Sequence, residues 1–341
     1  MNGAPQIDAI EPMCALPGGE VRITGRALRP QELQRPEVRF GDVDGSIVIS
    51  SEQFIVARVP EGASSGNVVV ATNGHRSNPR EVRVAVPVAE NLHPVANPAV
   101  DAEGNIYATF SGSRGQKVPV AIFRIDANHD VKPFVPEMMN PTGLAFGHDG
   151  ILYASSRYDG NVYRVSANGA VTLFAEGLGV ATGIAFDREG NLYVGDRSGT
   201  IFKVGRDGQI FVFAMIEPSV SAFHLAFGDD GNLYVTGPTT SSFDAVYQVD
   251  PHGHVEVFYR GLGRPQGLAV DAHGNLYVAA SLHGRRGIVK LTPDRQASLE
   301  VSGQNLVGLA FGPGGSAVLA TTSGVLSLAW GIQGRTLIPS S

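Results

Sequence analysis

The chain has 341 residues, of which 43% are hydrophobic and 17% are charged, and its formal net charge at pH 7 is −6. This composition supplies enough apolar side chains for folded cores and excludes a disordered chain. The negative charge argues against a general affinity for nucleic acid or for anionic membranes. Glycine is unusually frequent, with 43 residues spread along the chain between short apolar runs such as VVVA and LYVA. We therefore predict an all-β protein with many tight turns.

The N-terminus carries no visible targeting signal. Its first residues, MNGAPQIDAIEPM, contain neither the basic stretch nor the apolar segment of a signal peptide. No apolar run reaches the length of a transmembrane helix, and the single cysteine, Cys14, excludes an internal disulfide. We expect a cytoplasmic protein.

Residues 1–86 show the alternation of a small β-sandwich. Apolar and polar residues alternate in EVRIT, EVRF, FIVARV, NVVVAT and EVRVAV, which are separated by glycine and proline turns. The combination of GGEVRITG, VRFG, VARVPEG and SSGNVVVAT resembles the IPT/TIG immunoglobulin-like domain over essentially the whole segment. This resemblance implies a spacer or a partner-binding module. Residues 87–96, PVAENLHPVA, are punctuated by proline and are expected to be a linker.

The rest of the chain, residues 97–341, is built from a repeat of about 40 residues. Its copies are PAVDAEGNIYATF (98–110), GLAFGHDGILYASS (143–156), GIAFDREGNLYVGD (183–196), HLAFGDDGNLYVTG (224–237), GLAVDAHGNLYVAA (267–280) and GLAFGPGGSAVLATT (308–322). Each copy reads as two strands around an Asp/Asn-Gly turn, followed by two further strands. A repeat of this length with four strands is typical of a β-propeller blade, so we predict a six-bladed β-propeller after an immunoglobulin-like β-sandwich.

The closure of the ring has two interpretations. The tail segments GVLSLAW and GRTLIP can supply the third and fourth strands of the sixth blade. Alternatively, EVRVAVPV (81–88) adds to that blade from the other end of the chain.

We expect the ligand-binding residues on one face of the propeller. Because strands alternate in direction, the loops that enter the first strand of each blade and those that follow the second strand emerge on the same face, around the central channel. We predict ligand contacts from the loop residues Asn97, Arg114, Thr142, Arg157, Thr182, Arg197, Thr240, Gln266, His283 and Arg285. The arginines would favour a carboxylate or phosphate. Alternatively, they are solvated, or they pair with Asp159, Asp196 and Asp244 between blades.

His224 departs from the repeat, because most blades have glycine at its position. At the channel mouth its imidazole could act as a general base oriented by Asp196, and this pair is the candidate catalytic site. The alternative is a structural histidine that is hydrogen-bonded to a backbone carbonyl.

The blades resemble NHL repeats and, more broadly, the propellers of the SMP-30/gluconolactonase/strictosidine synthase-like group. That resemblance implies a lactone hydrolase whose channel holds a divalent metal such as Ca²⁺, Mn²⁺ or Zn²⁺. The family grips its metal with a Glu in EGP, an Asn in NGL and an Asp in DGM. Here ANP replaces EGP, and the aligned positions are Ala96, Thr142, Thr182, Phe223, Gln266 and Val307, none of them a carboxylate.

The sequence therefore favours a binding propeller over an enzyme. We expect a small anionic or sugar-like ligand, or a protein partner bound through the propeller face or the TIG domain, and no nucleic acid or membrane partner. A lactone or ester hydrolase is the alternative, and no metal ligands are assigned.

Overall fold

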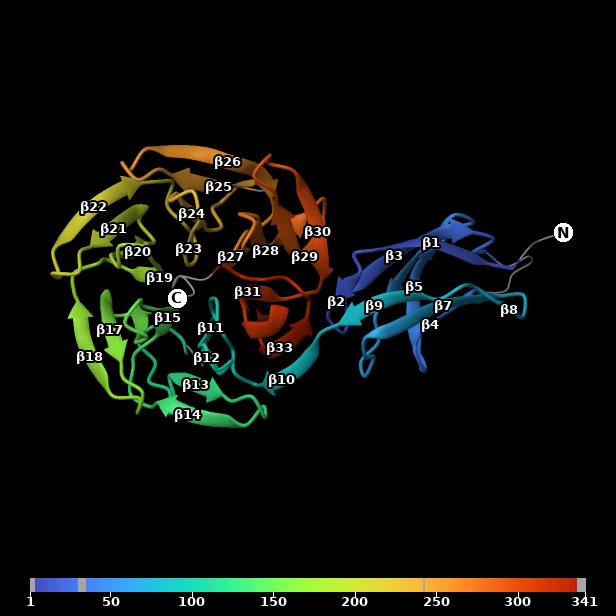
Figure 1. Cartoon of the computed structure of the whole chain (residues 1–341), viewed down its shortest axis with the longest axis horizontal. Coiled ribbons are helices and arrows are strands. Elements are labelled where there is room, and N and C mark those ends of the chain that lie inside the picture. The colour runs from blue at the N-terminus through green and yellow to red at the C-terminus, as the bar shows by residue number, and fades with distance from the viewer. Residues whose placement is uncertain (1–3, 30–34, 111, 242, 336–341) are drawn as a thin grey trace.

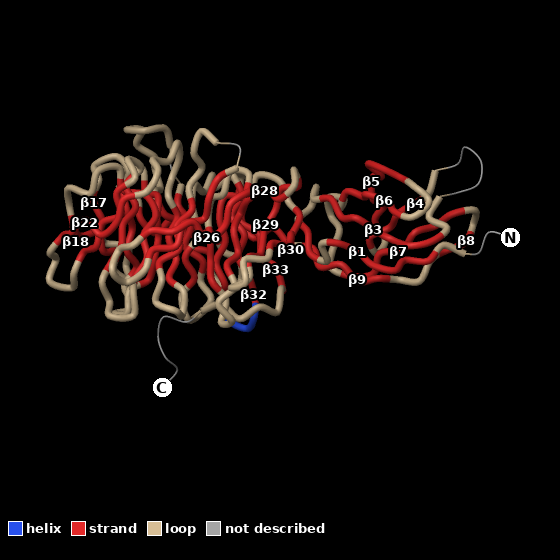
Figure 2. Tube along the Cα trace, turned by 90° about the horizontal axis from the view of Figure 1, so that it is seen from above, coloured by secondary structure: helices blue, strands red, loops and turns tan. Residues whose placement is uncertain are grey.

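The computed structural model describes residues 4–29, 35–110, 112–241 and 243–335. Figure 1 shows a ring of sheets with a smaller sandwich at its side, and Figure 2 shows the same arrangement with the ring seen edge-on. Strands and loops make up the described residues apart from one short 3₁₀ turn, Pro313–Gly315. Within these residues, no helix is long and apolar enough to cross a membrane.

The sandwich is formed by the strands that lie between residues 6 and 84. Its strands are β1 (Gln6–Glu11), β2 (Cys14–Ala15), β3 (Glu20–Arg26), β4 (Glu37–Phe40), β5 (Val43–Ser50), β6 (Phe54–Arg58), β7 (Gly66–Thr72), β8 (His75–Arg76) and β9 (Arg80–Val84). One sheet has the order β1-β3-β6-β5 and the other β5-β4-β7-β9, because β5 pairs with β6 in its second half and with β4 in its first.

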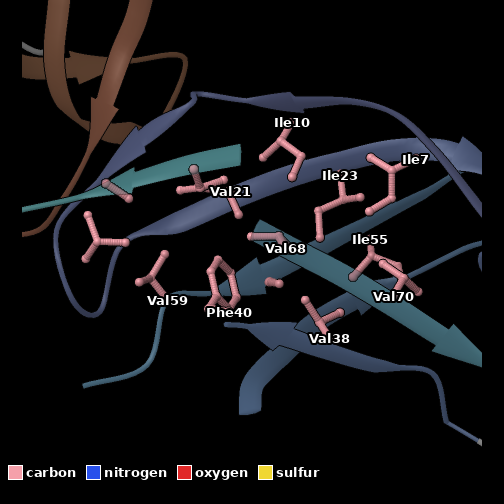
Figure 3. Packing of buried hydrophobic residues seen from close by; sticks show 14 of the residues in the cluster. Ile7, Ile10, Val21, Ile23, Val38, Phe40, Ile55, Val59, Val68 and Val70 are labelled. Carbon is pink, nitrogen blue, oxygen red and sulfur yellow. The ribbon is translucent and has the colours of Figure 1, made fainter. Parts of the chain in front are cut away.

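The core of the sandwich follows from the period-two pattern of its strands. Val21 and Ile23 of β3 are fully buried, and so are Val68 and Val70 of β7. They meet in one cluster, with Phe40 of β4 between the sheets (Figure 3). The residues between them in sequence point outward, as alternating strands require.

Six four-stranded blades make up the ring. The first three are β11 (Ala99–Val100), β12 (Ile106–Thr109), β13 (Ile122–Ile125), β14 (Val131–Val135); β15 (Pro141–Phe146), β16 (Leu152–Ser156), β17 (Asn161–Val165), β18 (Val171–Ala175); β19 (Ala181–Phe186), β20 (Leu192–Asp196), β21 (Thr200–Val204), β22 (Ile210–Met215). The next two are β23 (His224–Phe227), β24 (Leu233–Thr236), β25 (Asp244–Val249), β26 (Val255–Leu262); β27 (Leu268–Val270), β28 (Leu276–Leu282), β29 (Arg285–Leu291), β30 (Ala297–Ser302). The sixth is β31 (Leu306–Phe311), β32 (Ser316–Thr321), β33 (Gly324–Ala329) and β10 (Val86–Glu90).

The recurring DGNLY motif is a structural device. In blade five, the Asp271 carboxylate accepts hydrogen bonds from the backbone and side-chain nitrogens of Asn275, at 2.9 and 2.8 Å, and from the Tyr277 hydroxyl at 3.1 Å. Blade one repeats this network around Asp101. The motif therefore fixes the turn between the first two strands and anchors a buried tyrosine.

The ring closes with a strand from before the first blade. Strand β10 pairs antiparallel with β33 as the fourth strand of blade six. Val88 and Ala89 of β10 are buried with Val325 of β33. Part of the segment expected to be a linker thus belongs to the propeller, and of the two closures considered, the one through the N-terminal side is formed.

The tail does not supply that fourth strand. Residues 331–335 instead run under the channel, where Gly334 bridges Asp271 and the Arg335 backbone N–H donates to Val270 O at 2.9 Å. The Arg335 side chain is buried and pairs with Asp229 at 2.8 Å. The last part of GRTLIP, from residue 336 on, lies outside the described residues.

The two parts share a sheet. Strand β2 runs parallel to both β30 of blade five and β9 of the sandwich. Beside it, the Leu16 N–H donates to Ser302 O at 2.8 Å, and the Ser302 hydroxyl accepts from the Glu20 N–H at 2.9 Å. Main-chain hydrogen bonds therefore set the position of the sandwich against the ring.

Candidate ligand-binding face of the propeller

The channel is closed by main chain at the end where the first strands of the blades begin. The Gly183 N–H donates to Phe223 O at 2.9 Å, and the Gly267 N–H donates to Val307 O at 3.0 Å. A Cβ added at Gly183 would lie 2.4 Å from Phe223 O, and one added at Gly143 would lie 2.4 Å from Thr182 O. Glycine recurs at this position because neighbouring first strands touch there, and only a cavity of about 20 Å³ remains.

His224 lines this small cavity and is 4% exposed. Burial lowers the pKa of its imidazole to about 4, so the ring is neutral at pH 7. No side-chain hydrogen bond joins it to another described residue. Neither the bond to Asp196 nor the bond to a carbonyl that the sequence suggested is formed.

Asp196 has other partners. Its carboxylate accepts from the Val180 N–H at 2.7 Å and from the Ser198 hydroxyl, and it packs against Gly179. It therefore holds the loop that leads into β19. The proposed catalytic pair is not assembled, and we assign no chemistry to it.

Two of the remaining predicted residues, Asn97 and Thr182, link neighbouring blades. Asn97 donates to Leu268 O at 2.8 Å and accepts from the Leu309 N–H at 3.1 Å. The Thr182 hydroxyl donates to Gly195 O at 2.8 Å and accepts from the Phe223 N–H, while the Thr142 hydroxyl donates to Asn140 O. Gln266 is half-buried and Thr240 exposed on the same face.

Three arginines tie neighbouring blades to each other through carbonyl groups. Arg157 Nη2 donates to Gly112 O at 2.9 Å, and Arg197 Nη2 donates to Val220 O at 2.9 Å. Arg286 Nη2 donates to Leu306 O at 2.8 Å. The partners are therefore not Asp159, Asp196 or Asp244, the alternatives that the sequence offered.

These three arginines, together with the exposed Arg114 and Arg264, form a group that we call the arginine collar. Throughout the described residues, no carboxylate forms an ion pair with any of the five. Burial and the nearby charges of Arg197 and Arg114 lower the pKa of Arg157. Burial and Arg264 do the same for Arg286. The collar thus has two parts, Arg114, Arg157 and Arg197 on blades one to three and Arg264 with Arg286 at blade five, and within each part positive charges lie near one another without an ion pair to a described carboxylate.

Much of the donor capacity of the collar is unused. A guanidinium has five N–H donors, and the Nε atoms of Arg157 and Arg197 are buried without a partner in the part of the chain that the structure describes. The carbonyl bonds fix the direction of both side chains. Guanidinium groups held in a fixed direction in this way suit the bidentate binding of a carboxylate or phosphate.

His283 and Arg285 do not lie at the mouth of the channel. Strands β28 and β29 have seven residues each and form a long hairpin. Its turn, at His283 and Gly284, therefore lies away from the channel. Arg285 Nη2 donates to the carbonyls of Glu11 and Glu20 in the sandwich, at 3.1 and 3.3 Å. Both residues thus belong to the junction of the two domains, contrary to their predicted place at the channel mouth.

Sequence reasoning did not select Arg264 or Asn140. Arg264 adopts a positive φ of 47° in the loop entering β27, beside Arg286. Asn140 is buried and holds the loop of blade one, accepting from the Gly115 N–H at 2.7 Å and donating to Gly112 O at 3.0 Å. The GLGRPQG run around Arg264 was a signal for an exposed turn at the entry of a blade.

The upper channel does not fit the family's metal. The aligned entry positions, from Ala96 to Val307, bring no carboxylate, and the amide of Asn97 is engaged on both sides. Glu90, the acidic residue that most closely precedes these positions in sequence, lies on β10, the outermost strand of blade six. No group of three or more His, Cys, Asp or Glu residues that could hold a metal occurs in the described ranges.

Comparisons with known proteins agree with both domains. Residues 5–82 match the model of the IPT/TIG domain. No curated protein sequence is significantly similar to the chain. A structure of a protein provisionally named as a gluconolactonase shares 20% identity, with a TM-score of 0.62 over 74% of this chain and 93% of its own.

Two further structures share the fold at lower identity. An auxiliary nutrient binding protein from Bacteroides thetaiotaomicron has 12% identity and a TM-score of 0.57 over 96% of this chain and 98% of its own. A catalytically inactive virginiamycin B lyase from Staphylococcus aureus, solved with quinupristin, has 14% identity and a TM-score of 0.53 over 86% and 99%. The chain thus consists of an IPT/TIG domain followed by a β-propeller with the fold of gluconolactonase-like propellers.

Proposed function

We propose that the protein is a binding protein whose propeller takes an anionic ligand on the face that carries the arginine collar. The observation that carries this proposal is the absence of any described carboxylate partner for the five guanidinium groups, on a chain whose net charge is −6. A ligand with two or more carboxylate or phosphate groups would offset the burial and the repulsion between arginines that together lower the pKa of Arg157 and Arg286.

The geometry also favours a ligand that spans several blades. Arg114 comes from blade one, Arg157 from blade two and Arg197 from blade three, while Arg264 and Arg286 come from blade five. Because the carbonyl bonds already hold the three half-buried side chains, little rotamer entropy is lost on binding. The similar fold of an auxiliary nutrient binding protein is compatible with this role.

The test is calorimetric titration with citrate and with tripolyphosphate at low ionic strength. We expect binding that weakens as salt is added, because charge pairing dominates it. The double variant Arg114→Gln/Arg264→Gln removes two exposed side chains that make no hydrogen bond to described residues. It should weaken binding at least tenfold.

The matched control is Arg206→Gln. Arg206 is an equally exposed arginine in the turn between β21 and β22, on the opposite face. It should leave the affinity unchanged. Binding that is insensitive to salt, or that keeps its affinity in the double variant, would overturn the proposal. Saturable binding of the neutral glucono-1,5-lactone, with no binding of citrate or tripolyphosphate, would show that the ligand is sugar-like and not anionic.

A further inference from the structure

A second binding site is suggested by the cleft between the TIG domain and blade five. Its volume is about 690 Å³, within the range of ligand sites of roughly 300–1,000 Å³. Glu11, Met13 and Glu81 line the sandwich side, and Leu299 and Trp330 line the propeller side. This cleft is separate from the arginine collar and differs from it in charge.

One wall of the cleft is a free sheet edge. Strand β2 pairs with β30 only at Val301 and Ser302. The first four residues of β30, Ala297–Glu300, have no strand partner on this side among the residues that the structure describes. Unpaired main-chain groups on such an edge are a template for an added strand.

Carboxylates outnumber guanidinium groups in the lining of the cleft, with Glu11, Glu81 and Glu300 against Arg83 and Arg285. The Arg83 guanidinium is occupied by the carbonyls of Trp330 and Ala329, and Arg285 by carbonyls of the sandwich. The carboxylates of Glu11 and Glu81 make no hydrogen bond or ion pair to any described residue. Glu300 accepts one bond, from the Ser298 hydroxyl at 2.6 Å. Charge complementarity therefore selects a cation.

Apolar side chains lie between these carboxylates. Met13 is 66% exposed at the edge of the cleft, and Leu299 is half-buried on β30. Trp330 is 6% exposed, and its ring is held edge-on against Tyr277 with 5.1 Å between centroids. A ligand that alternates basic and apolar side chains matches this surface.

We propose that the cleft binds an extended basic peptide segment of a partner protein, added as a strand along β30. Its main chain pairs with Ala297–Glu300, and its lysine or arginine side chains meet Glu11, Glu81 and Glu300. Its apolar side chains pack on Met13 and Leu299 beside Trp330. The site continues the line of β2, which occupies the same edge two residues further along.

Trp330 makes the test site-specific, because it is the only tryptophan in the chain. The probe is a capped seven-residue peptide of alternating lysine and valine, titrated while tryptophan fluorescence is recorded. We expect a saturable change. The double variant Glu81→Gln/Glu300→Gln should raise the Kd at least tenfold, and Glu103→Gln, an exposed carboxylate in blade one, should not change it.

Three further probes separate the parts of the proposal. The corresponding glutamate–valine peptide should not bind. An N-methylated lysine–valine peptide, which lacks main-chain donors, should bind at least tenfold more weakly because it cannot complete the strand pairing, and equal binding would overturn the added strand. Spermidine carries the charge without a peptide backbone. Equal binding of spermidine and the peptide, or equal binding by the Glu81→Gln/Glu300→Gln variant, would overturn the proposal.

Discussion

Acid should destabilise the propeller through His224. Its folded pKa of about 4 lies below the 6.5 of a histidine in water, so the unfolded chain takes up a proton over a pH range where the folded chain does not. The free energy of unfolding therefore falls as the pH decreases from about 6.5 to about 4, and His224 adds no further loss below that. Between pH 7 and pH 5 the loss is about 2 kcal/mol, since one pKa unit corresponds to about 1.4 kcal/mol.

The assay is urea unfolding at pH 7, 6 and 5, followed by the fluorescence of Trp330 in the propeller. His224→Gln keeps a polar side chain of similar size but cannot be protonated. The wild-type protein should lose about 2 kcal/mol more than this variant between pH 7 and pH 5. Equal losses in the two proteins would show that His224 is protonated or hydrogen-bonded in the folded state, and the reasoning from its burial would fail.

Three other predictions concern the closure strand, the buried thiol and the channel. Val88→Asp should destabilise the protein by about 3 kcal/mol or more, because it buries a carboxylate inside blade six. Val86→Asp, at a position of the same strand where the side chain is 50% exposed, should cost less than about 1 kcal/mol; thermal unfolding compares the two, and similar effects would contradict the closure. Burial raises the pKa of Cys14 to about 11, so a disulfide reagent at pH 8 should modify it far more slowly than in urea; equal rates would argue against its burial. Hydrolysis of glucono-1,5-lactone, measured by pH-stat with Ca²⁺, Mn²⁺ or Zn²⁺, should stay at the spontaneous rate because the channel entries offer no carboxylate; turnover that EDTA abolishes would contradict this.

The parts of the fold that depend on local interactions were predictable from sequence. The hydrogen bonds that the Asp271 carboxylate accepts from Asn275 span four residues, so this turn is specified within the motif itself, as it is around Asp101 in blade one. The burial of Val21 and Ile23 follows from period-two alternation within one strand. The turn motif and the alternation of apolar residues are each contained in a short segment of sequence. For this reason the propeller and the sandwich could both be recognised from sequence.

The closure of the ring was not predictable in this way. Two apolar segments could each have supplied the missing strand, and their local patterns are equivalent. Strand β10 takes the position because Val88 and Ala89 pack with Val325, more than 230 residues later in the chain. The position of Arg285 has a similar origin, since the length of the β28–β29 hairpin and the carbonyls of the sandwich decide it together.

For the arginine collar, the sequence repeat predicts the loops that hold the arginines but not the groups to which they bond. The repeat placed Arg157 and Arg197 in equivalent loops, and the structure places both guanidinium groups against carbonyls of adjacent blades. The acceptor could not be read from sequence, because carbonyls are present at every residue. A neutral acceptor orients the arginine but leaves its charge uncompensated, whereas an aspartate would have done both. The same bond that stabilises the ring therefore leaves the face able to attract an anion.

The junction between the domains, like the arginine contacts, depends on main-chain groups that sequence does not distinguish. Strand β2 has two residues and lies between Pro12 and Pro17, so no strand propensity would select it. It forms because β9 and β30 both present main-chain groups to it, and parallel pairing on its two sides places these strands about 10 Å apart. That spacing is set by hydrogen-bond length rather than by a linker. The cleft beside β2 therefore has a main-chain edge at a fixed position, as a site for an added strand requires.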